Sequence, residues 1–273
     1  MHRVFRQLFR FALVFIAVGQ TTSCVYADKS VTANSQRDHF FFVQITDTHF
    51  GDADHYKRTR RIVDGINKLP MKIEFVVHTG DITMDLVNEE EVVTESKAIL
   101  NKLKAPLYYI PGNHDILAFD INSTRHEYNK QFGKLIQQVQ IQGVTFIFMY
   151  TEPLATSVAI PGYHPLEQLQ ALLQDNKGNP VVICHHRPSV TDFYENKKHP
   201  GWPEKNRRRW VTLLNDYKVK AVIAGHFHKD EHHWLGAVPL YISAPVAGYW
   251  GRQASFRIYE YNNGKISYRT QYR

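Results

Sequence analysis

Five short polar stretches carry the residues of this sequence that could do chemistry, and each follows a short apolar run. The most specific is Pro-Gly-Asn-His-Asp at residues 111–115, which sets an amide, an imidazole and a carboxylate beside the apolar run 107–110. The other four are Asp47-Thr48-His49, Gly80-Asp81, His185-His186 and Gly225-His226-Phe227-His228. One such stretch alone is typical of a turn, since Pro, Gly, Asn and Asp all favour turns. Five of them, each ending a predicted strand, indicate a metal site assembled from strand ends.

The spacing of these side chains suits a site with two metal ions. Asp47 and His49 are two residues apart, as are His226 and His228, so each pair can reach one ion or divide between two. Asp81 has two carboxylate oxygens and could bridge both ions. Two ions roughly 3.5–4 Å apart would hold a phosphoryl group and make hydroxide available at neutral pH. Mixed nitrogen and oxygen ligands without thiolate favour Mn, Fe or Zn over a soft metal such as Cu(I).

The elements that must position these residues alternate in the first half of the chain. Apolar runs predict strands over residues 40–46, 74–79 and 107–110. Helical spacing predicts a helix over residues 56–69 and a second one that begins near residue 88. This alternation is typical of parallel strands joined by crossover helices, whose carboxyl ends lie at one edge of the sheet.

The second half of the chain predicts further strands, two helices and a hairpin. Strands are expected at residues 138–141, 144–150, 221–224 and 240–242, and helices at 165–173 and 205–217. In the tail, alternating apolar residues flank Asn263-Gly264, a strong hairpin turn signal. We therefore expect the tail to form a second, more antiparallel sheet that packs on the first. No linker interrupts the chain, so we expect one domain.

Residues 1–27 are predicted to be a signal peptide. Three arginines precede the apolar run 11–18, and Val25-Tyr26-Ala27 fits a cleavage site with small residues at its first and last positions. The apolar run is too short to span a bilayer. We therefore expect export to the periplasm or outside the cell, a mature domain over residues 28–273, and no stable membrane insertion after cleavage. Lipid anchoring at Cys24 is the less favoured alternative.

Removing the signal peptide changes the charge and the cysteine count of the chain. Its three arginines have no acidic partner in the segment, so 30 basic and 26 acidic residues remain, a net charge of +4 instead of +7. This is an ordinary surface charge, and with no recognisable nucleic-acid module it predicts no nucleic-acid partner. Only Cys184 remains, so no disulfide is expected within the domain. The sequence does not indicate an oligomeric state.

The five stretches resemble, in order, the signatures of the calcineurin-like metallophosphoesterases, and the resemblance covers essentially the whole mature chain. The resemblance implies an α/β fold with two mixed β-sheets flanked by helices, a four-layer αββα sandwich. It places a dinuclear metal centre at the strand ends and implies a small anionic phosphoester as the substrate.

The resemblance also implies roles for individual residues. Asp47, His49 and His228 would bind the first metal, Asn113, His185 and His226 the second, and Asp81 would bridge them. His185 is preferred because it follows its strand directly, with His186 as the second choice. His114 and Asp115 are the predicted catalytic residues, with His114 as hydrogen-bond donor or general acid near the leaving group.

Two positions depart from the family pattern. Met84 stands where many relatives carry an aspartate that orients the catalytic histidine, so either Asp85 or Asp115 could orient His114. Arg187 stands where proline is more common. The other histidines receive structural interpretations: His78 is predicted to lie in the core, and His232 and His233 on the surface.

The predicted function is hydrolysis of phosphoric esters by a metal-activated hydroxide that attacks phosphorus in line. Phosphomonoesters are favoured, because the basic stretch from Lys197 to Arg209 follows the fourth polar stretch and could cover the site. The alternative interpretation of this basic stretch is a solvated loop followed by the start of a helix. The alternatives are a cyclic-nucleotide or other phosphodiesterase and, because some relatives have lost their metals, a non-catalytic binding scaffold.

Overall fold

The computed structural model describes residues 39–273, so the predicted signal peptide, its cleavage site and Cys24 lie outside the described residues. The strands are β1 (His39–Ile45), β2 (Ile73–His78), β3 (Leu107–Tyr109), β4 (Ile136–Ile141), β5 (Val144–Met149), β6 (Val181–Cys184), β7 (Ala221–Ala224), β8 (Glu231–Leu235), β9 (Val238–Ile242), β10 (Ser255–Asn262) and β11 (Lys265–Tyr272). The helices are α1 (Ala53–Asn67), α2 (Glu90–Leu100), α3 (Ile121–Gln131), α4 (Glu152–Ala155), α5 (Pro165–Asp175) and α6 (Glu204–Asp216), with a 3₁₀ turn at Tyr249–Gly251.

The first sheet has the strand order β11-β10-β1-β2-β3. β1, β2 and β3 are parallel neighbours, which confirms the crossover arrangement predicted for the first half of the chain. The tail forms the predicted hairpin around Asn263-Gly264, but β10 pairs with β1 in the first sheet. The expectation that the tail builds the second sheet is therefore wrong, because alternation identifies a strand without identifying its partner.

The second sheet comes from the middle of the chain, in the order β4-β5-β6-β7-β9-β8. β5, β6, β7 and β9 are parallel neighbours, whereas β4 and β8 pair antiparallel at the two edges. Both sheets are thus mixed.

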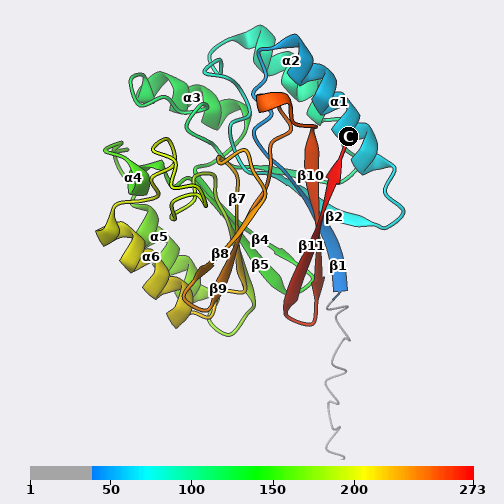
Figure 1. The fold of residues 1–273 in the computed structure, drawn as a ribbon. Helices are drawn as coiled ribbons and strands as arrows, with labels where there is room; N and C mark the ends of the chain where they lie inside the picture. Colours follow the sequence, from blue (N-terminus) through cyan, green and yellow to red (C-terminus); the bar gives the residue numbers. More distant parts are fainter. Residues whose placement is uncertain (1–38) are drawn as a thin grey trace, which may run out of the picture. The chain divides into compact units, whose positions relative to one another are not determined.

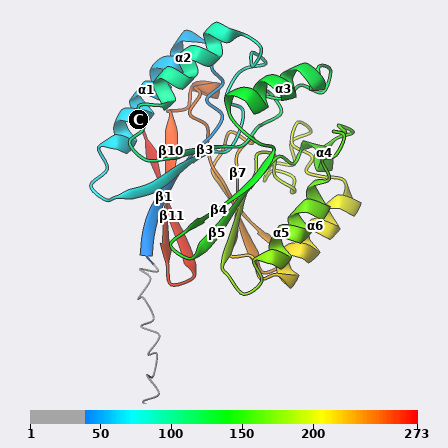
Figure 2. The same cartoon turned by 180° about the vertical axis from the view of Figure 1, so that it is seen from behind.

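Alternating side chains divide the core into three apolar layers, which separate four layers of structure. Phe42 of β1 and Phe146 of β5 meet between the sheets, with ring centroids 5.2 Å apart. Val43, on the other face of β1, packs in the layer beneath α1 and α2. Ile147, on the other face of β5, packs in the layer beneath α5 and α6. Figures 1 and 2 show these helices outside the two sheets, which confirms the four-layer αββα sandwich.

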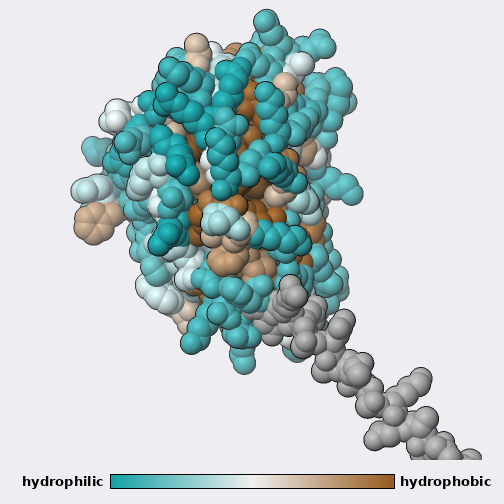
Figure 3. All heavy atoms as spheres, turned by 90° about the vertical axis from the view of Figure 1, so that its right-hand side faces the viewer, coloured by the Kyte–Doolittle hydropathy of each residue, from teal (hydrophilic) through white to brown (hydrophobic). Residues whose placement is uncertain are grey.

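The outer surface is mainly hydrophilic on the face seen in Figure 3, with apolar side chains visible between the polar ones. Among the described residues, no helix combines the length and the apolar character needed to cross a membrane. The predicted helices are present at their expected places. α3 was not predicted, because few of its residues are apolar and its only buried side chains are Thr124 and Tyr128.

Candidate metal centre

The loops that follow the strands of both sheets are hydrogen-bonded to one another. The backbone N–H of Asp47 donates to the carbonyl of Gly80 over 2.9 Å, which joins the loops after β1 and β2. The N–H of Val246, after β9, donates to the carbonyl of Thr46 over 3.0 Å and so joins the first sheet to the second. The N–H of His226 donates to the Asp47 carboxylate over 3.1 Å. The predicted meeting of strand ends therefore occurs between the two sheets.

Several residues of this centre have left-handed backbone. They are Asp47, His49, Asp81, Asp85, His226 and His228, with φ between 44° and 71°. Such angles are uncommon for residues other than glycine and cost free energy, and they concentrate at functional sites. The hydrogen bonds between the loops hold this conformation in place.

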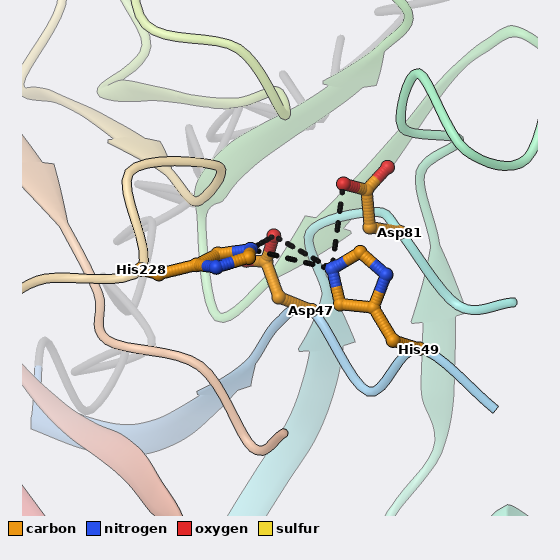
Figure 4. Close-up of side chains that lie close together, drawn as sticks. All are labelled: Asp47, His49, Asp81 and His228. Carbon is orange, nitrogen blue, oxygen red and sulfur yellow. Dashed lines mark hydrogen bonds and ion pairs between the residues drawn. The ribbon is translucent and has the colours of Figure 1, made fainter. Parts of the chain in front are cut away.

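The first group of candidate ligands comprises Asp47, His49, Asp81 and His228, whose ligand atoms lie within 4.8 Å of one another (Figure 4). Nε2 of His228 lies 3.1 Å from Oδ1 of Asp47 and 3.3 Å from Nε2 of His49. Nε2 of His49 lies 3.7 Å from Oδ2 of Asp81. Carboxylate oxygens and imidazole nitrogens that converge in a buried space are a donor set suited to Mn, Fe or Zn.

The second group comprises Asp81, His186 and His226, again within 4.8 Å of one another. Nε2 of His186 lies 3.0 Å from Oδ2 of Asp81. Oδ1 of Asn113 and Nε2 of His226 are buried without a hydrogen-bond partner among residues 39–273. Buried polar atoms normally have partners, and a bound cation would supply one for both atoms. The residues present therefore fit a second metal ion.

Asp81 belongs to both groups and is the only described residue that does. Its Oδ1 accepts a hydrogen bond of 2.9 Å from the backbone N–H of His114, while its Oδ2 faces the histidines. Burial raises the pKa of this carboxyl, but His186 and His49 outweigh burial and hold the pKa below its ordinary value. Burial also raises the pKa of the Asp47 carboxyl, but His228 outweighs burial and holds this pKa well below its ordinary value. Both carboxyls are therefore ionised, as metal binding requires.

The structure brings His186, and not the preferred His185, to this centre. His185 is fully buried between Trp202 and Trp210, with ring centroids 5.5 and 5.4 Å away. Its Nδ1 lies 3.3 Å from Oγ1 of Thr151. Burial lowers the pKa of His185 to about 3, so it is a neutral side chain of the core.

Strand alternation explains this correction. In β6, Ile183 faces the layer beneath α6 and Cys184 faces the first sheet. Continued alternation turns His185 towards α6 and His186 towards the first sheet and the centre. The same count along the sequence could have selected His186.

His114 is held by Asp85. Nδ1 of His114 lies 2.8 Å from Oδ1 of Asp85, and the N–H of Asp85 donates to the carbonyl of His114 over 3.2 Å. Burial lowers the pKa of His114, but the charge of Asp81 and the hydrogen bond to Asp85 outweigh it and raise the pKa. The carboxylate missing at Met84 is thus supplied one residue later.

Asp115, predicted as catalytic, has a different position. Its buried carboxylate accepts hydrogen bonds from the backbone N–H groups of Ile82, Thr83 and Gly112, at 3.1, 2.9 and 2.9 Å. It joins the loops after β2 and β3 and does not line the cavity over the centre. The structure therefore gives Asp115 a structural role.

A cavity of about 560 Å³ opens over the centre. Besides His49, Asp81, His114, His226 and His228, it is lined by Lys198, His199, Lys229, Tyr249, Trp250 and Arg252. Only the first part of the basic stretch reaches it. Arg207 and Arg208 pair with Glu204, and Arg209 pairs with Glu167 on α5.

His78, His232 and His233 have the structural positions that the sequence predicts. His78 is fully buried, with Nε2 2.9 Å from Oγ1 of Thr48. His232 and His233 lie on the edge strand β8, the first exposed and the second half-buried. No motif marks the segment that carries Tyr249, Trp250 and Arg252, so the sequence alone does not single them out.

Two mixed sheets flanked by helices, with histidines and carboxylates converging at the strand ends, define the fold and site of a metallophosphoesterase. The calcineurin-like phosphoesterase profile matches residues 42–230, and the chain belongs to this family. The family and the two groups of candidate ligands agree on a dinuclear metal site.

Relatives with curated names include phosphodiesterases and phosphatases. The chain is 24% identical to a probable cyclic nucleotide phosphodiesterase of Pseudoalteromonas, over 75% of this chain and 80% of the relative. It is 22% identical to the serine/threonine-protein phosphatase CPPED1 of Mus musculus, over 78% of this chain and 77% of that protein. Its fold is similar to that of a purple acid phosphatase from yellow lupin seeds, with a TM-score of 0.64 and 15% identity. That match covers 86% of this chain and 52% of the lupin chain.

Proposed function

We propose that the protein is a dinuclear metal-dependent hydrolase of phosphoric esters that favours phosphomonoesters. The observation that carries the proposal is that Asp81 is shared by two groups of buried candidate ligands. Asp47, His49 and His228 would hold one metal, and Asn113, His186 and His226 would hold the other. Two ions held there would polarise the phosphoryl oxygens and supply a nucleophile at neutral pH.

His114 serves as the proton donor to the leaving group. Its Nδ1 is bonded to Asp85, so Nε2 is the nitrogen that remains for the substrate. His114 lines the cavity, and its raised pKa keeps the ring protonated to higher pH. In-line attack on phosphorus breaks the bond to the ester oxygen, and His114 protonates that oxygen as it leaves.

The preference for monoesters rests on the cations around the cavity. Lys198, Lys229 and Arg252 line it, and Lys198 and Arg252 have no ion-pair partner among the described residues, whereas Lys229 pairs with Asp192. A phosphate with two negative charges therefore gains more there than a diester with one. This replaces the arginines of α6 as the basis of the preference, because their carboxylate partners lie on α5 and α6.

A phosphoester panel on stripped protein reloaded with Mn, Fe, Zn, Co or Mg tests the proposal. We expect turnover to require metal and to be faster on 4-nitrophenyl phosphate than on bis(4-nitrophenyl) phosphate. Faster turnover of the diester would favour the phosphodiesterase alternative. No metal binding and no turnover of either ester would favour a non-catalytic scaffold.

We also infer export, with a mature N-terminus at or near Asp28. The support is the basic segment, apolar run and small-residue site within residues 1–27. Mass spectrometry of the N-terminus of exported material tests it. A lipid-modified Cys24 would overturn the assignment of a freely exported domain.

A further inference from the structure

A second cavity adjoins the one over the metal centre. It has a volume of about 590 Å³ and is lined by Phe193, Tyr194, His232 and Tyr272, among others. Lys229 and Arg252 line both cavities and so mark the boundary between them. We refer to these two adjoining cavities, which share Lys229 and Arg252 in their linings, as the groove.

Exposed aromatic side chains gather along this groove. Among residues 39–273, the exposed large apolar side chains are Met84, Phe119, Phe193, Tyr194, Trp234, Trp250, Tyr268 and Tyr272. Five of these eight line one cavity or the other: Met84 and Trp250 the first, and Phe193, Tyr194 and Tyr272 the second. Exposed apolar side chains concentrated in a concave region mark a binding site.

Trp250 is the most informative member of this set. Its backbone is left-handed, with φ 53° and ψ 35°, which is costly for a bulky residue and typical of functional sites. Its side chain is 66% exposed, so packing in a core does not explain the conformation. Its ring centroid lies 5.5 Å from that of His228, and the preceding Tyr249 stacks on His228 at 4.6 Å. Trp250 therefore stands at the rim of the metal centre.

Lys198 and Arg252 are cations of the groove that have no carboxylate within ion-pair distance among the described residues, whereas Lys229 pairs with Asp192 at 3.0 Å. Arg252 donates to the carbonyl of His228 over 3.0 Å. Of the carboxylates that line the second cavity, Asp230 pairs with Arg257 at 2.6 Å, and Glu231 accepts a hydrogen bond from the N–H of Phe193 at 3.2 Å and lies 2.7 Å from Nε2 of His233. The groove therefore suits an anion joined to an apolar ring.

We propose that this groove binds the alcohol part of the substrate and that Trp250 stacks on a flat ring in it. The proposal rests on the proposed function, since it places the phosphoryl group at the metal centre. The occupant is the ester of a planar ring, whether an aryl alcohol or a nucleoside, and the two sources are separated by the test below.

The test compares Trp250→Ala with Trp234→Ala in the metal-loaded protein. Trp234 is a matched control, because it is 63% exposed and lines neither cavity. The substrates are 4-nitrophenyl phosphate, a nucleoside 5′-monophosphate and glycerol phosphate. We expect Trp250→Ala to lower kcat/KM about tenfold on at least one ring-bearing ester, mainly through KM, and distinctly less on glycerol phosphate. Trp250→Phe should recover most of the loss, and Trp234→Ala should match the wild type.

The pattern of losses decides the proposal. A loss on the aryl ester alone, or on the nucleotide alone, supports it and names the source of the ring. Equal losses on all three substrates, or equal losses in Trp250→Ala and Trp234→Ala, would overturn it.

A binding measurement separates the failure of this proposal from failure of the proposed function. Calorimetry compares phenylphosphonate with methylphosphonate on the metal-loaded wild type and on Trp250→Ala. We expect the wild type to bind phenylphosphonate more tightly and Trp250→Ala to lose that preference. No preference in the wild type would overturn the aromatic subsite even if esters are hydrolysed. A preference without any turnover would keep the subsite and refute the hydrolase.

Discussion

His185 and His186 are neighbours in the chain, yet their side chains face opposite layers. His186 faces Asp81 at the metal centre, and His185 lies between two tryptophans beneath α6.

We expect His186→Ala to lose bound metal and most turnover. We expect His185→Ala to keep its metal but to lose roughly 2 kcal/mol of stability, which lowers Tm by ~4–8 °C, because it leaves a gap in a packed layer. Elemental analysis and thermal unfolding of both variants measure these effects. Metal loss in His185→Ala with His186→Ala fully loaded would return the ligand role to His185.

His114 and Asp85 are expected to act on the leaving group without holding metal. His114→Ala should keep the metal content of the wild type and slow turnover by ~10²–10⁴, the usual loss for an acid–base group. Asp85→Asn removes the charge that orients the ring and should slow turnover by ~10–100-fold. Asp81→Asn provides the contrast, since loss of the shared carboxylate should lower the metal content as well.

The leaving group distinguishes this role from a general structural effect. An alkyl phosphate has a poor leaving group that needs the proton, whereas 4-nitrophenolate leaves without it. Both His114→Ala and Asp85→Asn should therefore slow hydrolysis of glycerol phosphate more than that of 4-nitrophenyl phosphate. Equal losses on the two esters, or depleted metal in His114→Ala, would contradict the assignment.

At the scale of elements, the loops after the strands depend on glycines that let side chains approach the backbone. A Cβ on Gly112, at the start of the loop after β3, would lie 2.0 Å from Oδ1 of Asp81. Gly112→Ala should therefore displace the shared carboxylate and lower metal content and turnover. Gly65→Ala in α1 is the control, because the nearest atom to its Cβ is Nε of the flexible Arg273 side chain, at 3.0 Å. This control should keep full activity, and helix propensity favours alanine by ~1 kcal/mol. Full metal content and activity in Gly112→Ala would show that the loop can shift without consequence.

The elements also show what the sequence could and could not predict. Strand ends carrying Asp47, Asp81 and Asn113 were recognisable because an apolar run stops within four residues before each ligand. The strand that pairs with β10 could not be predicted from the sequence. Alternation of residues such as Phe256 and Ile258 fits either sheet, and the pairing is decided by long-range packing. α3 was not predicted because its apolar periodicity is weak, and tertiary contacts stabilise this mainly polar helix.

Within the site, the roles that were not predicted depend on contacts that no local sequence pattern encodes. Strand alternation beyond β6 indicates His186, but the sequence alone does not say how the chain leaves the sheet after that strand. The structural role of Asp115 depends on three N–H groups from two separate loops. Trp250 comes to His228 through folding of the segment after β9, and no spacing between them encodes that contact.

At the scale of the whole molecule, basic residues are divided between two surfaces. The loop before α6 is held over the centre by the buried Asp192, which accepts hydrogen bonds from the N–H of Asn196 at 2.7 Å and from Lys229 at 3.0 Å. This loop brings Lys198 to the cavity. The three arginines of α6 instead pair with two carboxylates, Glu204 on α6 and Glu167 on α5, which offset two of their three charges. Proximity in sequence to the metal ligands therefore does not determine which cations the substrate meets.

The Michaelis constant distinguishes the cations that line the cavity from the arginines of α6. Lys198→Ala should raise KM for 4-nitrophenyl phosphate about three- to tenfold, and KM for bis(4-nitrophenyl) phosphate less, since a dianion loses more Coulomb energy than a monoanion. Added salt should reduce the difference between Lys198→Ala and the wild type, because exposed charges are screened.

Lys197→Ala is the matched control, since it removes the same charge from the same loop but Lys197 does not line the cavity. Neutralising Arg207, Arg208 and Arg209 together should likewise leave KM within about twofold of the wild type, because these arginines do not line the cavity and two carboxylates offset two of their three charges. Equal effects of Lys198→Ala and Lys197→Ala would show that only net charge matters, and a larger effect of the triple variant would restore α6 as the element that attracts the substrate.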